Sequence, residues 1–113
     1  MREDIQMNKA LEPYQEELVN QLQTIYDPEI GLDIYNLGLI YGIELDATNH
    51  CILTMTFTGV ACTCIETMPG EITDKLTQID GIDSAEVQVV WQPAWRLDRI
   101  SRLGRITLGI NPN

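Results

Sequence analysis

The sequence predicts a small α/β (α+β) domain in which helices pack against a mixed three-stranded sheet. Apolar residues recur every three or four positions in three segments and alternate with polar residues in three others. The segments follow one another in the order helix, strand, strand, helix, strand, helix. The chain has 113 residues, the length of one domain. Residues 11–113 are expected to form that domain, after a flexible N-terminal tail of residues 1–10.

The first helix is expected over residues 11–26. Its apolar residues share one face: Leu11, Tyr14, Leu18, Leu22 and Ile25. Pro13 suits the opening turn, where the missing backbone N–H is not needed. Because Pro28 disfavours a helical conformation for the residue before it, the helix is expected to end near Tyr26.

Two strands are expected next, over residues 39–45 and 51–57, where apolar and polar residues alternate. The link of residues 46–49 is rich in turn-forming residues, which predicts an antiparallel hairpin. Cys51 lies on the apolar side and is expected to be a core thiol. His50 is expected to be a surface residue rather than a metal ligand.

A second helix is expected to begin near residue 65, because Pro69 is tolerated only in an opening turn. It is expected to end near residue 79, before Asp80 and Gly81. Residues 85–91 alternate and predict a third strand, parallel to the second. A last helix is expected to stop at Gly109. Its inner side is expected to hold four residues: Leu97, Ile100, Leu103 and Thr107.

Composition and charge narrow the classes of function. No apolar stretch approaches the ~20 residues that a membrane span needs, and the first residues do not resemble a secretory signal, so a cytoplasmic location is expected. The net charge of −10 disfavours nucleic acid as a partner. Residues 92–113 differ, with four arginines against one aspartate. These arginines are expected either to form a solvated helix face or to dock an acidic protein patch.

The loop of residues 58–64 is where chemistry is expected. It joins the second strand to the second helix, and the unpaired N–H groups of a helix start favour ionisation of a nearby thiol. Three cysteines without a secretory signal indicate reduced thiols. Cys62 is therefore the predicted reactive thiol, and Cys64 either packs toward the core or acts as a second thiol. Since a closed metal site needs four ligands, any metal is expected to be held weakly, shared across a homodimer or completed by a client protein.

Carboxylates form a second element beside Pro28. Asp27 and Glu29 stand at the exit of the first helix, with Asp33 further along. Taken alone, these residues indicate only the end of a helix that is capped by a polar side chain and terminated by Pro28. The sequence shows no glycine-rich phosphate loop and no serine–histidine–acid set, so an enzyme is not expected.

Six short segments occur in a recognisable order: Asp27-Pro28-Glu29, Asn36-Leu37-Gly38-Leu39-Ile40-Tyr41, Thr56-Phe57-Thr58 followed by Cys62, residues 81–89, Trp91-Gln92-Pro93-Ala94-Trp95 and Leu108-Gly109. Together they resemble the SufT/PaaD-like family of metal–sulfur cluster biosynthesis proteins, which includes the eukaryotic cytosolic iron–sulfur targeting subunit. The resemblance covers roughly residues 18–109. Each segment is a weak signal, and the ordered set is a strong one.

The resemblance implies an accessory factor in iron–sulfur cluster assembly or in delivery of clusters to client apo-proteins. Cys62 would be the signature cysteine, with Asp27 and Glu29 as an acidic motif near it and Thr58 in the motif before it, and Cys64 is a further candidate ligand. The implied cofactor, if the protein holds one at all, is a transient iron–sulfur cluster or iron. The implied partners are assembly proteins and client apo-proteins, and a homodimer would bring two Cys62 loops together. The family usually has a proline after this cysteine, whereas Thr63 follows here, which favours Cys64 as a second ligand or a resolving thiol.

Three alternatives stay open. A PaaD-like maturation partner would serve one metallo-oxygenase, although no cysteine follows Cys64. A thiol redox protein would use Cys62 with Cys64, but a single intervening residue strains such a disulfide. An interaction module would leave the cysteines inert and dock through Trp91 and Trp95, whose simpler role is to cover the sheet edge.

Overall fold

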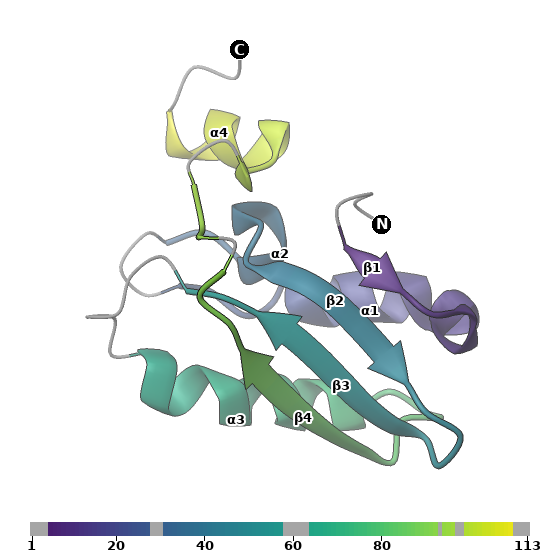
Figure 1. Cartoon of the computed structure of the whole chain (residues 1–113). Coiled ribbons are helices and arrows are strands. Elements are labelled where there is room, and N and C mark those ends of the chain that lie inside the picture. The colour runs from purple at the N-terminus through teal and green to yellow at the C-terminus, as the bar shows by residue number, and fades with distance from the viewer. Residues whose placement is uncertain (1–4, 28–30, 58–63, 93, 97–98, 110–113) are drawn as a thin grey trace.

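A four-stranded mixed sheet runs through the protein, with helices α1 and α3 against one of its faces (Figure 1). The structure is a computed structural model, and it describes residues 5–27, 31–57, 64–92, 94–96 and 99–109, with the backbone alone at 64–66. The strands lie in the order β1 (Gln6–Met7), β2 (Ile40–Leu45), β3 (His50–Met55) and β4 (Ser84–Val89). The helices are the 3-10 helix η1 (Lys9–Tyr14), α1 (Gln15–Leu22), α2 (Ile34–Leu37), α3 (Cys64–Thr77) and α4 (Arg102–Leu108).

The central strands confirm the predicted connections. β2 and β3 form an antiparallel hairpin with Leu45 opposite Cys51. The Asp46 side chain accepts hydrogen bonds from the backbone N–H groups of Thr48 and His50, which stabilises the turn between them. β4 runs parallel to β3, and α3 makes the crossover between the two.

The sheet has one strand more than predicted, and that strand comes from the segment expected to be a flexible tail. β1 pairs in parallel with β2, with Gln6 opposite Gly42. The Asn8 side chain holds this segment in place, because it donates to the Leu45 carbonyl oxygen at 2.8 Å and accepts from the Leu45 N–H at 3.1 Å. A two-residue strand carries no periodic pattern, so only the side-chain anchor distinguishes it from a tail.

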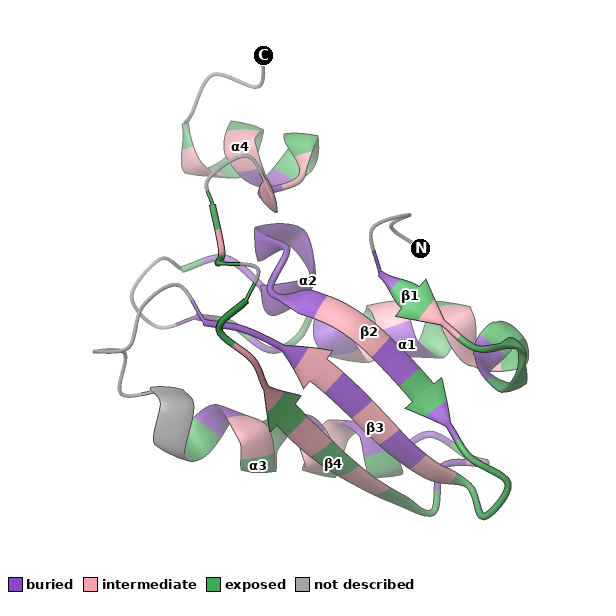
Figure 2. Ribbon diagram, viewed as in Figure 1, coloured by how far each residue is buried: buried purple, intermediate pink, exposed green. Residues whose placement is uncertain are grey.

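The first predicted helix is divided into two shorter ones. η1 ends at Tyr14, whose φ of −108° is not helical, and α1 begins at Gln15. All five residues of the predicted apolar stripe still face the interior, four of them fully buried and Tyr14 partly. The short helix α2 was not predicted, and all four of its residues are buried (Figure 2).

The last helix turns a different face inward from the predicted one. Of the four residues expected on the inner side, Ile100 is buried just before α4, whereas Leu103 is 62% exposed and Thr107 is also exposed. Leu97 lies outside the described residues. Gly104 is buried instead, and a Cβ added there would meet the side chains of Leu32 and Ile100. α4 ends at Gly109, as predicted, in the left-handed conformation.

The core lies between the sheet and the helices α1 and α3. It includes Cys51, which is fully buried as predicted. None of the helices in the described part of the chain is long and apolar enough to cross a membrane.

Candidate functional site

The carboxyl end of β3 is surrounded by buried polar groups, and α2 organises them. Asp33 caps α2, accepting a hydrogen bond from the Asn36 N–H at 2.9 Å, and its carboxylate also accepts from the Asn36 side-chain amide. The Asn36 amide oxygen in turn accepts from the Ser101 hydroxyl at 2.6 Å. Both Asp33 and Asn36 are less than 10% exposed, so this network is shielded from water.

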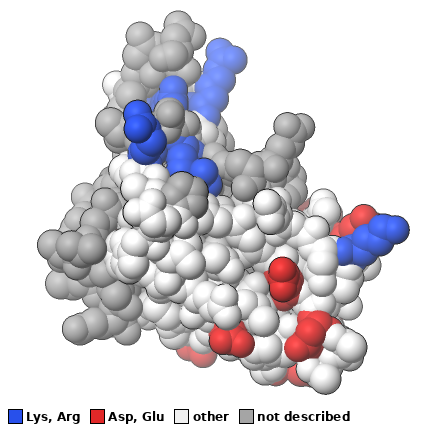
Figure 3. Space-filling model, in the orientation of Figure 1, with Lys and Arg blue, Asp and Glu red and all other residues white. Residues whose placement is uncertain are grey.

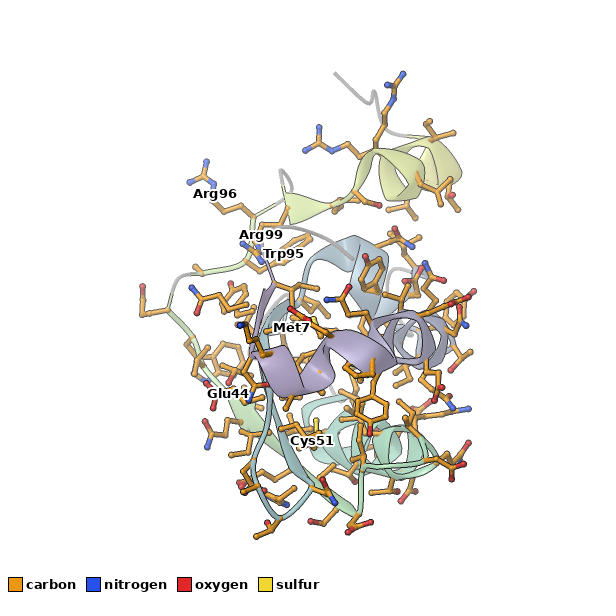
Figure 4. All side chains as sticks on the ribbon, turned by 90° about the vertical axis from the view of Figure 1, so that its right-hand side faces the viewer. Met7, Glu44, Cys51, Trp95, Arg96 and Arg99 are labelled. Carbon is orange, nitrogen blue, oxygen red and sulfur yellow. The ribbon has the colours of Figure 1, made fainter. Side chains whose placement is uncertain are left out.

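The segment before α4 is fixed to the end of α2 by two further hydrogen bonds. Trp95 Nε1 donates to the Leu37 carbonyl oxygen at 2.7 Å, and Arg99 Nε donates to the Gly38 carbonyl oxygen at 2.8 Å. The Arg99 guanidinium also lies 4.3 Å from the centre of the Tyr41 ring. Figure 4 shows Trp95 and Arg99 side by side, with Arg96 pointing away from the sheet. The tryptophan is thus a structural anchor in this fold.

Gly38 allows this close approach. Its φ of +77° lies in the left-handed region, and a Cβ at this position would collide with the backbone of Arg99. The segment identified by sequence, residues 36–41, is therefore the place where the middle of the chain meets its C-terminal part.

Asp27 belongs to the same end of the molecule. Three backbone hydrogen bonds lead there from the end of β3: Thr56 N–H to Leu39 O, Leu39 N–H to Ile34 O and Ile34 N–H to Ile25 O. Asp27 is fully buried, two residues beyond Ile25. The structure therefore brings the first residue of the acidic motif to the carboxyl end of β3, and the segment that contains Cys62 follows β3 in the sequence.

Thr56 and Phe57 are the last described residues before that loop. Thr56 is 1% exposed, and its hydroxyl has no hydrogen-bond partner among the described residues. Phe57 is buried and packs against Trp91, with ring centroids 6.3 Å apart. Trp91 is 41% exposed, so this aromatic contact lies at the surface of the protein.

Four of the five predicted site residues fall outside what the structure describes in full. Thr58, Glu29 and Cys62 lie outside the described residues, and Cys64 is described by its backbone alone, as the first residue of α3. Within the described part of the chain, no group of three or more His, Cys, Asp or Glu side chains is placed to hold a metal ion.

Cys51 is chemically distinct from a loop cysteine. It lies in β3 with its side chain in the core, and this burial raises the pKa of its thiol to about 11. Because the thiolate is the form that binds metal and attacks electrophiles, Cys51 is unsuited to either reaction near neutral pH.

The structure also contains a serine–histidine–acid arrangement that the sequence did not reveal. His50 Nδ1 lies 2.7 Å from Ser84 Oγ, and His50 Nε2 lies 2.9 Å from Glu86 Oε1. The parallel register of β3 and β4 produces it, since His50 is opposite Ser84 and Ile52 is opposite Glu86. Neither of the two described pockets is lined by these side chains. We interpret the arrangement as a cross-strand contact on the sheet surface.

A pocket of about 500 Å³ opens on the face of the sheet opposite α1 and α3. Met7, Glu44 and Arg99, labelled in Figure 4, contribute to its wall. None of the residues predicted for the site lines it. Its wall nevertheless reaches the carboxyl end of β3, because Thr54, next to the last residue of that strand, and Arg99, which is bonded to Gly38, both contribute to it.

Comparison with known proteins gives a consistent answer. The Fe-S protein maturation auxiliary factor YitW of Bacillus subtilis is 35% identical over 99 residues, which span 88% of this chain and 97% of that protein. The Fe-S protein maturation auxiliary factor SufT of Staphylococcus aureus is 37% identical over 87 residues, 77% of this chain and 99% of that one. The crystal structure of a domain of unknown function from Bacillus anthracis matches with a TM-score of 0.80 at 36% identity, covering 88% of this chain and 95% of that chain.

The family comparison agrees with the resemblance inferred from the ordered motifs. Residues 15–89 match the family described as iron–sulfur cluster assembly protein, a stretch that contains α1, α2, α3 and the three long strands. The chain belongs to this iron–sulfur cluster assembly protein family.

Proposed function

We propose that the protein is an accessory factor in the maturation of iron–sulfur proteins. In this role it helps to assemble clusters, or to deliver them to client apo-proteins, through the thiol of Cys62. It acts as a carrier and does not turn over a small substrate. Family membership supports the general role, as do two relatives that are named Fe-S protein maturation auxiliary factors.

The observation that carries the proposal is the connection from β3 to α3. β3 ends at Met55, and the 14-residue helix α3 begins at Cys64, two residues after Cys62. The first turn of a helix has backbone N–H groups without intrahelical partners and a partial positive charge. A thiol next to such a helix start loses its proton more readily, so Cys62 is the cysteine best suited to act as a thiolate.

The chemistry assigned to Cys62 is ligand exchange. Its thiolate would bind an iron atom of the cargo cluster and release it when a cysteine thiolate of the client takes its place. No electron is transferred in this exchange. One protein thiolate replaces another on the same iron, and a proton returns to the sulfur that leaves. A single ligand from this chain holds the cargo weakly, as a carrier requires.

The buried network around α2 has a supporting role in this proposal. It fixes Asp27 and the end of β3 in relation to each other, through the backbone bonds described above. Because the end of β3 is held rigidly, less conformational freedom has to be lost when cargo or client binds near it. Asp27 is thus assigned a positioning role.

Replacement of Cys62 tests the proposal directly. In cells that lack the endogenous protein, Cys62→Ser should fail to restore aconitase activity under iron limitation, whereas the wild-type chain restores it. Cys51→Ala is the matched control, because it removes a thiol that is buried in the core. Circular dichroism and protein abundance confirm that each variant is folded. Full activity of the Cys62→Ser variant would falsify the role of this thiol.

A second measurement distinguishes the role of Cys64 from that of Cys62. Each single serine variant is purified without oxygen, and iron and sulfide are measured after reconstitution. If Cys64 is a second ligand, Cys64→Ser lowers bound iron without removing it, while Cys62→Ser removes it. Equal iron in both variants and in the wild type contradicts the assignment of a ligand to this loop.

A further inference from the structure

The outer surface of α4 combines exposed apolar side chains with basic ones. The structure describes four large apolar residues as exposed, and two of them, Leu103 at 62% and Ile106 at 56%, lie three residues apart on this helix. Arg102, which is exposed, and Arg105, which is half-buried, are their neighbours in the sequence. We call these four residues the α4 ridge. Helices of monomeric proteins normally turn such apolar side chains inward, so exposed pairs indicate a docking surface.

The inward side of α4 is already occupied, and the ridge therefore cannot turn into the core. Gly104 packs against Leu32 and Ile100. Ser101 anchors the helix start, since its backbone N–H donates to the Asn36 carbonyl oxygen and its hydroxyl to the Asn36 side chain. These contacts fix the rotation of the helix and keep the ridge outward.

The charge of the ridge differs from that of the rest of the chain. Residues 92–113 carry a balance of +3 within a protein whose net charge is −10. Figure 3 shows most of the basic side chains in this view at the end of the molecule that α4 occupies, with one more at the right-hand edge beside an acidic side chain, while other acidic side chains appear on the lower part. A partner for the ridge should therefore be acidic and should offer an apolar hollow.

The chain has such a surface of its own. A hollow of about 470 Å³ lies over η1 and α1. Its lining combines two carboxylates with apolar and amide side chains: Glu12, Pro13, Gln15, Glu16, Val19 and Asn20. We call this the acidic hollow. Figure 1 shows α4 and η1 far apart, so the ridge cannot reach the hollow of the same molecule.

We propose that the α4 ridge of one copy docks in the acidic hollow of a second copy. Leu103 and Ile106 would cover Pro13 and Val19, and the arginines would face Glu12 and Glu16. The contact joins two different surfaces, so it closes into a dimer only where a two-fold axis lets both copies exchange ridges. The patch is small, and a dissociation constant of about 100 µM is expected.

Sedimentation equilibrium of the full chain tests the proposal. At low salt, association is expected with a dissociation constant of about 100 µM, and at about 0.5 M salt it should weaken at least about tenfold as the arginine–glutamate attraction is screened. A chain that stays monomeric up to about 0.5 mM at low salt overturns the proposal and leaves the ridge to a different partner.

Charge reversal locates the contact. Arg102→Glu with Arg105→Glu, and separately Glu12→Lys with Glu16→Lys, should each weaken association at least about tenfold. An equimolar mixture of the two variants should associate as well as the wild type, because each then offers the complement of the other. Glu71→Lys with Asp74→Lys makes the same charge change as the hollow variant on the exposed side of α3, and it should leave association unchanged. Failure of the mixture to associate, with both variants folded by circular dichroism, overturns the proposal.

Discussion

The two ends of β3 both carry polar side chains but differ in burial. At the amino end, His50 bonds to Ser84 and Glu86 on the sheet surface, where half of the Glu86 side chain is exposed. At the carboxyl end, Asp33 and Asn36 are buried and bonded to each other. A polar contact in water exchanges one set of hydrogen bonds for another, whereas a buried one must be satisfied within the protein. The difference indicates that the carboxyl end is the structurally demanding one, and the segment that contains Cys62 follows this end in the sequence.

The largest effect is expected at Gly38. Gly38→Ala should lower the free energy of unfolding by about 3 kcal/mol, because a side chain is strained at positive φ and would collide with the Arg99 backbone. Urea denaturation measures the loss. Gly70→Ala is the control, since Gly70 lies in α3 with open space around it and should become slightly more stable. Equal effects at the two glycines would show that the α2 junction is not tightly packed.

Removal of the amide at Asn36 should have the next largest effect. Asn36→Ala deprives the Asp33 carboxylate and the Ser101 hydroxyl of a buried partner, and the expected loss is about 2 kcal/mol in urea denaturation. The matched control is Asn20→Ala on the exposed side of α1, where little change is expected. A loss at Asn36 no greater than at Asn20 would mean that the buried network does not stabilise this end.

The buried thiol of Cys51, near the amino end of β3, should make the free energy of unfolding depend on pH. Burial raises the pKa of its thiol from 9.0 to about 11, so the unfolded chain releases the proton at lower pH than the folded one. The stability that the folded state gains from keeping this thiol protonated is therefore fully present below pH 9, and it is lost as the pH rises toward 11. The free energy of unfolding should fall by about 1 kcal/mol more in the wild type than in Cys51→Ala between about pH 8 and about pH 10. Parallel pH profiles for the two proteins would contradict the burial of this thiol.

The smallest effect is expected at His50. His50→Ala removes the contacts with Ser84 and Glu86, yet both partners can turn to water, so the loss should stay below about 0.5 kcal/mol. The same urea experiment that measures Asn36→Ala measures this variant. A loss as large as that of Asn36→Ala would remove the distinction between the two ends of β3.

The long elements of the fold could be predicted because their residues repeat with a clear period. The hairpin of β2 and β3, helix α3 and the parallel strand β4 were predicted from alternation and spacing, and the structure confirms them. β1 and α2 are too short for a period to show. They depend on individual polar contacts, from Asn8 to Leu45 and from Asp33 to Asn36, that join residues by geometry.

The face of α4 was predicted wrongly for a different reason. Leu103 was placed inside because apolar residues near it recur at helical spacing, but the helix packs through Gly104. Glycine adds nothing to an apolar pattern, and a close packing contact that depends on the absence of a side chain cannot be read from hydropathy. The contact of His50 with Ser84 was missed because it follows from strand register, which sequence spacing alone does not provide.

Within the candidate site, the sequence identified which segments take part, but it did not predict how their side chains are buried and packed. The acidic motif and residues 36–41 were recognised as segments, but the full burial of Asp27 and the collision that requires glycine at position 38 appear only in three dimensions. The assignment of Cys62 stays a prediction.

The hydrogen bonds from Trp95, Arg99 and Ser101 to α2 and Gly38 span 58 to 65 residues of sequence. A ribosome that has made only the first two thirds of the chain has therefore not yet made the groups that fix α2 in place. This end of the protein is completed late in translation, after the hairpin can already pair.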